Sequence, residues 1–329
     1  MLPPSMQTSR LLAILVTTML VLAAAACSGD DDNDVPEFPS VIPLGEGDVF
    51  PSIVNTSLSI GPNRVLWNLI DNDDNLLLDG GLRVRYFNLN GEEPRFTEEV
   101  EARLVSTELN FIHENNGRAR TVTGTGGVYV TNAHFDEAGD WGAEVKVFRR
   151  PENATILYRF TVRDDSEEPS IGDLAPASVQ ATTATEPIEE IDSSYPFRQA
   201  MHTTTVADAL KAGQPIVIAF ATPAFCASRT CGPVLDLVVD PLFWQYGDRA
   251  QFIHIEPYVL RDAREANLRN PVPTALEWRL RTEPWIFVVA PDGRIAAKFE
   301  GIVARDEVEA ALLPLLDAGT SGSTPSPAP

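Results

Sequence analysis

The stretch Pro215-Ile-Val-Ile-Ala-Phe-Ala-Thr-Pro-Ala-Phe-Cys226 begins with an unbroken apolar run and ends in a cysteine. A short continuous apolar run of this kind predicts a buried strand over residues 215–221. Four residues further on stands Cys231, followed by Gly232-Pro233. Proline is tolerated in the first turn of a helix, so this dipeptide predicts a helix start and a helix through residue 239. The segment therefore places two thiols between a buried strand and a helix.

Elements of both types surround this segment in residues 200–318. Apolar runs and turn signals predict strands at 251–256, 285–290 and 294–299, and helices at 206–212 and 306–316. This order, with a cysteine pair after the first strand, resembles the thioredoxin superfamily. The resemblance implies an α/β thioredoxin-like domain over residues 200–318. It also implies that Pro284 is a cis-proline packed against a disulfide between Cys226 and Cys231, with all three residues serving catalysis.

The spacing of the cysteines departs from the Cys-x-x-Cys of that family. A continuous helix turns about 100° per residue, so five residues would leave the two sulfurs ~140° apart. The pair can close only if the four intervening residues form a loop. Proximity to the strand favours Cys226 as the attacking thiol, whereas the helix start favours Cys231, and the sequence leaves this choice open.

Ionisable residues around the pair also depart from the family pattern. The strand before the cysteines has no carboxylate, and Glu283, next to Pro284, is the nearest substitute in the sequence. Arg229, between the cysteines, would favour a thiolate, so the direction of the thiol pKa shift is undecided.

Three alternatives compete with thiol–disulfide exchange. Thr222-Pro223 before Cys226 is similar to the peroxidatic site of peroxiredoxins, with Arg281 as a candidate thiolate-stabilising residue. A second alternative is a non-enzymatic binding protein whose disulfide is structural. The third is a copper chaperone in which His254 joins the cysteines, although the sequence predicts no cofactor and no metal site.

Residues 41–163 show a different pattern, with β-branched and aromatic runs separated by Asn, Asp and Gly turns. These runs lie at residues 64–70, 82–87, 127–131, 143–148 and 157–162. The segment 135–145 resembles a strand corner of immunoglobulin-like exported domains, so we expect an immunoglobulin-like β-sandwich. Composition further predicts a linker at 164–199 and a disordered tail at 319–329.

Residues 1–27 have the pattern of an export signal, with Arg10 followed by sixteen uncharged residues and then Cys27. The small residues before Cys27 resemble the lipobox of bacterial lipoproteins, although Ala24 stands where leucine is usual. The resemblance implies lipidation of Cys27, an acidic tether at 28–40, and a location at the extracytoplasmic face of the cell membrane. The alternative is an ordinary secretory signal that leaves Cys27 free.

The formal net charge of −22 makes nucleic acid an improbable partner because like charges repel. With Cys27 lipidated, the other two of the three cysteines can pair with each other. The sequence thus predicts a membrane-anchored thiol–disulfide oxidoreductase whose partners are exported proteins carrying thiols or disulfides. It does not decide whether the pair is catalytic or structural.

Overall fold

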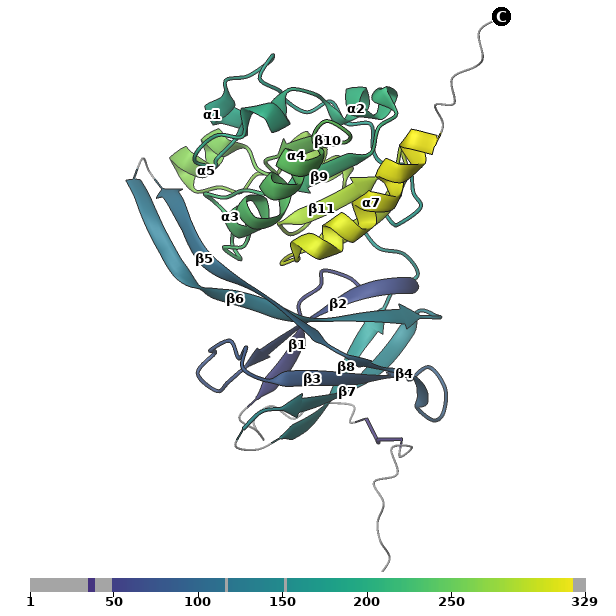
Figure 1. Ribbon diagram of the computed structural model, residues 1–329. Helices are drawn as coiled ribbons and strands as arrows, with labels where there is room; N and C mark the ends of the chain where they lie inside the picture. The colour runs from purple at the N-terminus through teal and green to yellow at the C-terminus, as the bar shows by residue number, and fades with distance from the viewer. Residues whose placement is uncertain (1–34, 39–48, 116–117, 151–152, 322–329) are drawn as a thin grey trace, which may run out of the picture. The chain divides into compact units, whose positions relative to one another are not determined.

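The computed structural model describes residues 35–38, 49–115, 118–150 and 153–321 (Figure 1). The predicted leader with Cys27, most of the tether and residues 322–329 lie outside the described residues. The first sheet is antiparallel and has the strand order β1-β2-β6-β5. Its strands are β1 (Phe50–Ile53), β2 (Gly61–Ile70), β5 (Arg103–Asn115) and β6 (Arg118–Phe135).

The second sheet is also antiparallel, with the order β4-β3-β7-β8. Its strands are β3 (Gly81–Asn88), β4 (Arg95–Glu101), β7 (Gly139–Phe148) and β8 (Ala154–Val162). Alternate side chains of the two sheets share one core, in which Trp67, Tyr86 and Trp141 are fully buried. The indole of Trp67 donates to the hydroxyl of Tyr86 over 3.2 Å, so the polar edge of this aromatic cluster is paired.

The third sheet carries the cysteine segment and has the order β10-β9-β11-β12. Its strands are β9 (Ile216–Phe220), β10 (Gln251–Ile255), β11 (Trp285–Val289) and β12 (Ile295–Glu300). Strands β9 and β10 are parallel, while β11 is antiparallel to both β9 and β12. Every residue of β9 and β11 is buried, which explains why their sequences are continuously apolar and do not alternate.

Most helices in the described residues are short. The helical elements are α1 (Ile188–Ile191), η1 (Gln199–His202), α2 (Val206–Ala212), α3 (Cys231–Val234), η2 (Leu235–Val239), α4 (Asp240–Tyr246), α5 (Leu260–Ala266), α6 (Pro273–Glu277) and α7 (Arg305–Ser321). Helix α2 has clear sequence signals at both ends: the side chain of Thr205 accepts from the Asp208 N–H, and Gly213 ends the helix with φ 65°. Within the described residues, no helix combines the length and the apolar character that crossing a membrane requires.

Two apolar clusters lie on opposite faces of the third sheet because side chains alternate along each strand. One cluster joins Val217 and Ala219 of β9 to residues of α7, η2 and α4, and it includes both Cys226 and Cys231. The other joins Ile216 and Ile218 to residues of α2 and to Trp278. The cysteines are therefore held by the sheet face that α7 also covers (Figure 1).

The predicted fold class is wrong. The described chain is mostly β: three four-stranded sheets, antiparallel or mixed, with helices of four to seven residues apart from α7. This is not the expected α/β thioredoxin-like fold, and the strand orders do not show an immunoglobulin-like sandwich. Sequence patterning located strands and helical turns, but local apolar runs carry no information about strand order or partner direction. The 18 residues of β6 also exceed any of the short strands expected.

Residues 164–199, predicted to be a linker, contain ordered contacts with the third sheet region. The N–H of Gly172 donates to the carbonyl of Ile295 over 2.8 Å, and that of Ala175 donates to Gly293 over 2.9 Å. Further along, Asp192 is fully buried directly after α1. This segment thus contributes side chains to the interior, which a solvated linker does not do.

Candidate dithiol site

The two cysteines lie in and just after the loop that follows β9. The loop spans residues 221–230 and ends at Thr230, the residue before α3, so that Cys231 is the first residue of that helix. Arg229 has φ 63°, a left-handed conformation that turns the backbone just before the helix. The intervening residues therefore form a loop and not a helix, as the spacing of the cysteines requires for pairing.

Hydrogen bonds gather on the sulfur of Cys226. The backbone N–H of Cys231 donates to Cys226 Sγ over 3.3 Å, and the hydroxyl of Ser228 lies 3.2 Å from the same sulfur. Ser228 is in turn 2.7 Å from the hydroxyl of Thr230. Both thiols are free in the structure, and a backbone donor at a helix start is an arrangement that stabilises a thiolate.

Glu283 completes this group. Its carboxylate accepts from the N–H of Ala227 over 3.0 Å and from the hydroxyl of Tyr258. One carboxylate oxygen and the sulfurs of Cys226 and Cys231 all lie within 4.8 Å of one another. The peptide bond between Glu283 and Pro284 is cis, as the resemblance implied, and Pro284 is buried just before β11.

The pKa values of the two thiols shift in opposite directions. Burial acts to raise the pKa of Cys226, but the hydrogen bonds from Cys231 and Ser228 outweigh it and lower this pKa to about 7. Burial raises the pKa of Cys231 well above its ordinary value, and the neighbouring Cys226 raises it further. Cys226 is 8% exposed and Cys231 is 0% exposed. Cys226 is therefore the more acidic and the more exposed thiol of the pair.

The other residues suggested by the sequence make no side-chain contact with the sulfurs that would give them the expected roles. Arg229 is exposed, and Arg281 pairs with Glu167. Thr222 is buried and reaches Cys231 through its backbone. His254 does not join the cysteines, because its ring contacts His202 and the carbonyl of Ala221. Arg281 and His254, the candidates for a peroxidatic and a copper site, thus have side-chain partners other than the two sulfurs.

Two contributors were missed by the sequence analysis, namely Ser228 and Tyr258. Ser228 lies between the cysteines, so its position in the sequence was a usable signal. Tyr258 follows β10 and reaches Glu283 only through the tertiary fold, and no local pattern marks it. Long-range polar contacts of this kind are outside what periodicity can reveal.

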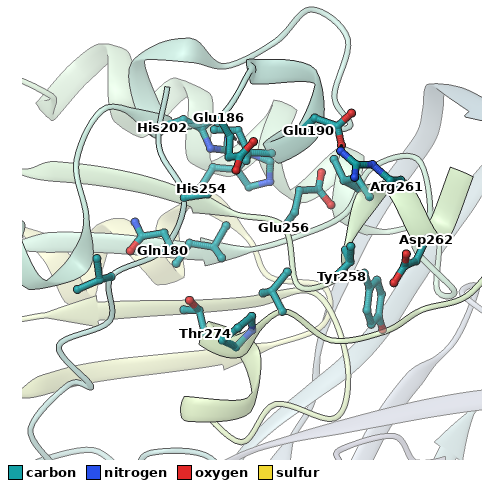
Figure 2. Close-up of a pocket in the computed structure, with 18 residues that line it drawn as sticks. Gln180, Glu186, Glu190, His202, His254, Glu256, Tyr258, Arg261, Asp262 and Thr274 are labelled. Atoms are coloured by element: carbon teal, nitrogen blue, oxygen red, sulfur yellow. Dashed lines mark hydrogen bonds and ion pairs between the residues drawn. The ribbon is translucent and has the colours of Figure 1, made fainter. Parts of the chain in front are cut away.

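A cavity of about 420 Å³ lies beside a second group of buried polar residues (Figure 2). His202, His254 and Glu256 line it, and all three are at most 5% exposed. Burial lowers the pKa of His254 to about 3 and raises that of Glu256 to about 8. The two side chains are therefore held in their neutral forms at pH 7.

Comparison with protein-family models finds no match for this chain, and comparison with curated proteins finds none. The functional interpretation consequently depends on the geometry of the site.

Proposed function

We propose that this protein is a thiol–disulfide oxidoreductase in which Cys226 is the nucleophile and Cys231 the resolving thiol. The observation that carries the proposal is the sulfur of Cys226, which accepts the Cys231 N–H at 3.3 Å and has a pKa of about 7. At neutral pH a substantial fraction of such a thiol is thiolate, the form that attacks disulfides.

The proposed reaction consists of two successive thiol–disulfide exchanges. The thiolate of Cys226 attacks one sulfur of a partner disulfide, forms a mixed disulfide and releases the other partner sulfur as a thiolate. Cys231 then loses its proton and attacks the Cys226 sulfur, which breaks the mixed disulfide, forms the Cys226–Cys231 bond and frees the second partner thiol. Two electrons pass from the protein pair to the partner, and the reverse sequence oxidises a partner dithiol.

Glu283 is suited to receive the proton of Cys231. Its carboxylate lies within 4.8 Å of both sulfurs, and Tyr258 and the Ala227 N–H hold it in place. A negative charge here also opposes the accumulation of thiolate on both cysteines. In the proposed reaction Glu283 therefore replaces the carboxylate that the resemblance led us to expect in the strand before the cysteines, since β9 contains none.

A trapping experiment tests the proposal. The full chain with Cys27→Ser carries only the Cys226–Cys231 pair, and its reduced form should cleave insulin disulfides and a fluorescent mixed-disulfide probe. Adding Cys231→Ser should trap a mixed disulfide on Cys226, whereas adding Cys226→Ser should abolish trapping. The proposal fails if the reduced pair reacts with neither substrate, a result that would favour a structural disulfide. Rapid consumption of hydroperoxide without disulfide cleavage would favour peroxidase chemistry instead.

The location of this chemistry is part of the proposal. The apolar leader ending at Cys27 and the acidic residues after it support a lipid anchor at the extracytoplasmic face of the membrane, with exported thiol or disulfide proteins as partners. Expressed in a bacterium, the chain should sediment with membranes and carry a diacylglycerol mass on Cys27. Replacement of Cys27 by alanine should release it. Equal membrane association of both forms would contradict lipidation.

A further inference from the structure

Asp192, His202 and His254 converge in the interior although they come from three separate segments. Asp192 follows α1, His202 ends η1, and His254 lies in β10. All three are at most 3% exposed. Nε2 of His202 is 3.0 Å from Nδ1 of His254 and 3.5 Å from Oδ2 of Asp192, and Nδ1 of His254 is 3.8 Å from Oδ1.

The orientation of His254 is set by the backbone. Its Nε2 lies 2.9 Å from the carbonyl oxygen of Ala221, and because a carbonyl only accepts, Nε2 carries the proton. In the neutral ring the lone pair of Nδ1 then points toward His202 and Asp192. A histidine ligand whose second nitrogen donates to a carbonyl is the usual arrangement around protein-bound metals.

Asp192 is also held by donors outside the cluster. Its Oδ1 accepts from the N–H of Ser194 over 2.8 Å, and its Oδ2 accepts from the N–H of Arg198 over 2.6 Å. The guanidinium of Arg198 is turned to other partners, Asp236 and Asp240. The hydroxyl of Ser194 also donates to Oδ1, so backbone and hydroxyl donors fix the carboxylate, which faces two imidazoles.

The spacing of the donor atoms suits a small divalent ion. With bonds of about 2.0–2.2 Å, adjacent ligands of a tetrahedral ion lie roughly 3.3–3.5 Å apart. The separations here, 3.0, 3.5 and 3.8 Å, bracket that value. Two imidazoles and one carboxylate form a donor set typical of Zn²⁺, Co²⁺ or Fe²⁺ and less suited to Ca²⁺ or Mg²⁺.

The cavity beside these three residues leaves room for a further ligand, and a buried carboxyl group in its wall is a second indication that something binds there. His202 and His254 line the cavity of about 420 Å³, as does Glu256 (Figure 2). Glu256 Oε1 accepts from the N–H of Ser193, while its Oε2 is buried and has no well-aligned hydrogen bond among the described residues, Thr222 being the neighbouring hydroxyl. An unpaired buried oxygen is costly, and a water or ligand in the cavity would satisfy it.

We propose that Asp192, His202 and His254 bind one divalent transition-metal ion, such as Zn²⁺, with a remaining coordination position open to this cavity. Three protein ligands with one open position is the pattern of zinc sites that bind water or a small ligand, whereas purely structural sites have four protein ligands. The site is separate from the thiol pair and does not depend on the proposed redox function.

Zinc titration of the full chain, followed by NMR of the imidazole nitrogens, tests the proposal without mutation. The sequence has four histidines, and the exposed His134 serves as an internal control. The ¹⁵N signals of His202 and His254 should shift together and reach a limit as zinc is added, with His134 unchanged. Shifts that spare His202 and His254, or that occur only at His134, would overturn the assignment.

A second experiment measures binding in a chain without thiols. Cys226, Cys231 and Glu283 lie within 4.8 Å of one another and could hold a metal ion themselves, so the cysteines are replaced. In a chain with all three cysteines replaced by serine, equilibrium dialysis should give one Co²⁺ per chain and visible d–d absorption. His202→Ala should weaken Co²⁺ binding at least thirty-fold, and His134→Ala should leave it unchanged. If the triple variant does not fold, the NMR titration alone decides. Equal Co²⁺ affinity in the His202→Ala and parent chains would refute the site.

Discussion

Cys226 and Cys231 are chemically unlike although both are buried. The sulfur of Cys226 collects donors from the Cys231 N–H and Ser228, whereas that of Cys231 is fully enclosed. Because donors stabilise the thiolate and enclosure destabilises it, the two pKa values separate. This separation supports the proposed roles of Cys226 as the attacking thiol and Cys231 as the resolving thiol.

Alkylation should therefore report one reactive thiol. In the reduced Cys27→Ser chain, iodoacetamide should modify Cys226 first, with a rate that is half-maximal near pH 7 and falls about tenfold per pH unit below it. The rate falls because protonation removes the nucleophilic thiolate. Peptide mass mapping of a time course checks this. Initial labelling of Cys231, or a midpoint near 8.5 as for a free thiol, would contradict the assignment.

The hydroxyl of Ser228 should lower the pKa of Cys226, and with it the pH at which alkylation is half-maximal. This hydroxyl lies 3.2 Å from the Cys226 sulfur, and Ser228→Ala removes one donor to the thiolate. A hydrogen bond to a charged group contributes about 1.5–3 kcal/mol, discounted here because Ser228 is exposed, so the pKa of Cys226 should rise by about one pH unit. Thiolate absorbance at 240 nm across a pH titration measures it. Thr203→Ala, an exposed threonine outside the site, is the control and should leave the midpoint in place.

At the scale of elements, α7 holds the sheet face on which the cysteines lie. Val308, Leu312 and Leu316 recur at intervals of four along this helix, so they share one face and pack with Val217 and Val288. Burial of that face, and not helix propensity, positions α7.

Two adjacent leucines of α7 give a matched pair. Leu312 is 0% exposed and Leu313 is 39% exposed. Leu312→Ala should lower the free energy of unfolding by about 2–5 kcal/mol because it leaves a cavity against β9 and β11. Leu313→Ala should change it by only about 0.5 kcal/mol. Urea denaturation measures both, and similar losses for the two variants would show that this face does not dock as described.

At the scale of the whole molecule, residues 164–199 are tied to the third sheet region by buried polar contacts. The indole N–H of Trp278 donates to the hydroxyl of Ser178 over 3.1 Å, and that hydroxyl donates to Glu277. Trp278 is fully buried, and this hydrogen bond of its indole joins residues 100 positions apart in the chain.

Ser178→Ala should therefore destabilise the protein although the change is small. It leaves the buried indole N–H of Trp278 unpaired, a loss of about 1–3 kcal/mol in the free energy of unfolding. Thr203→Ala, with an exposed hydroxyl, should cost about 0.5 kcal/mol or less. Thermal and urea unfolding compare the two variants. An unchanged stability of Ser178→Ala would support the linker predicted from composition.

The sequence by itself determined where several of the strands lie and that the thiols must be joined by a loop, although it did not predict β1, β4 or β5. Runs such as 64–70 and 82–87 predicted strands that correspond to β2 and β3, because strand formation follows local patterning. The loop followed from helix geometry and the cysteine spacing alone. Glu283 was identified as the nearest carboxylate, and it does lie within 4.8 Å of both sulfurs.

Only the tertiary structure decided the strand order, the unequal thiols and the cluster of Asp192, His202 and His254. Asp192 lies in a segment whose composition indicates a linker, and its carboxylate lies 3.8 Å from His254 of β10, a strand that pairs with β9. The strand order, the difference between the two thiols and this cluster all depend on burial and on long-range hydrogen bonds. Burial and such hydrogen bonds arise from contacts between residues far apart in the chain, which local composition and periodicity do not encode.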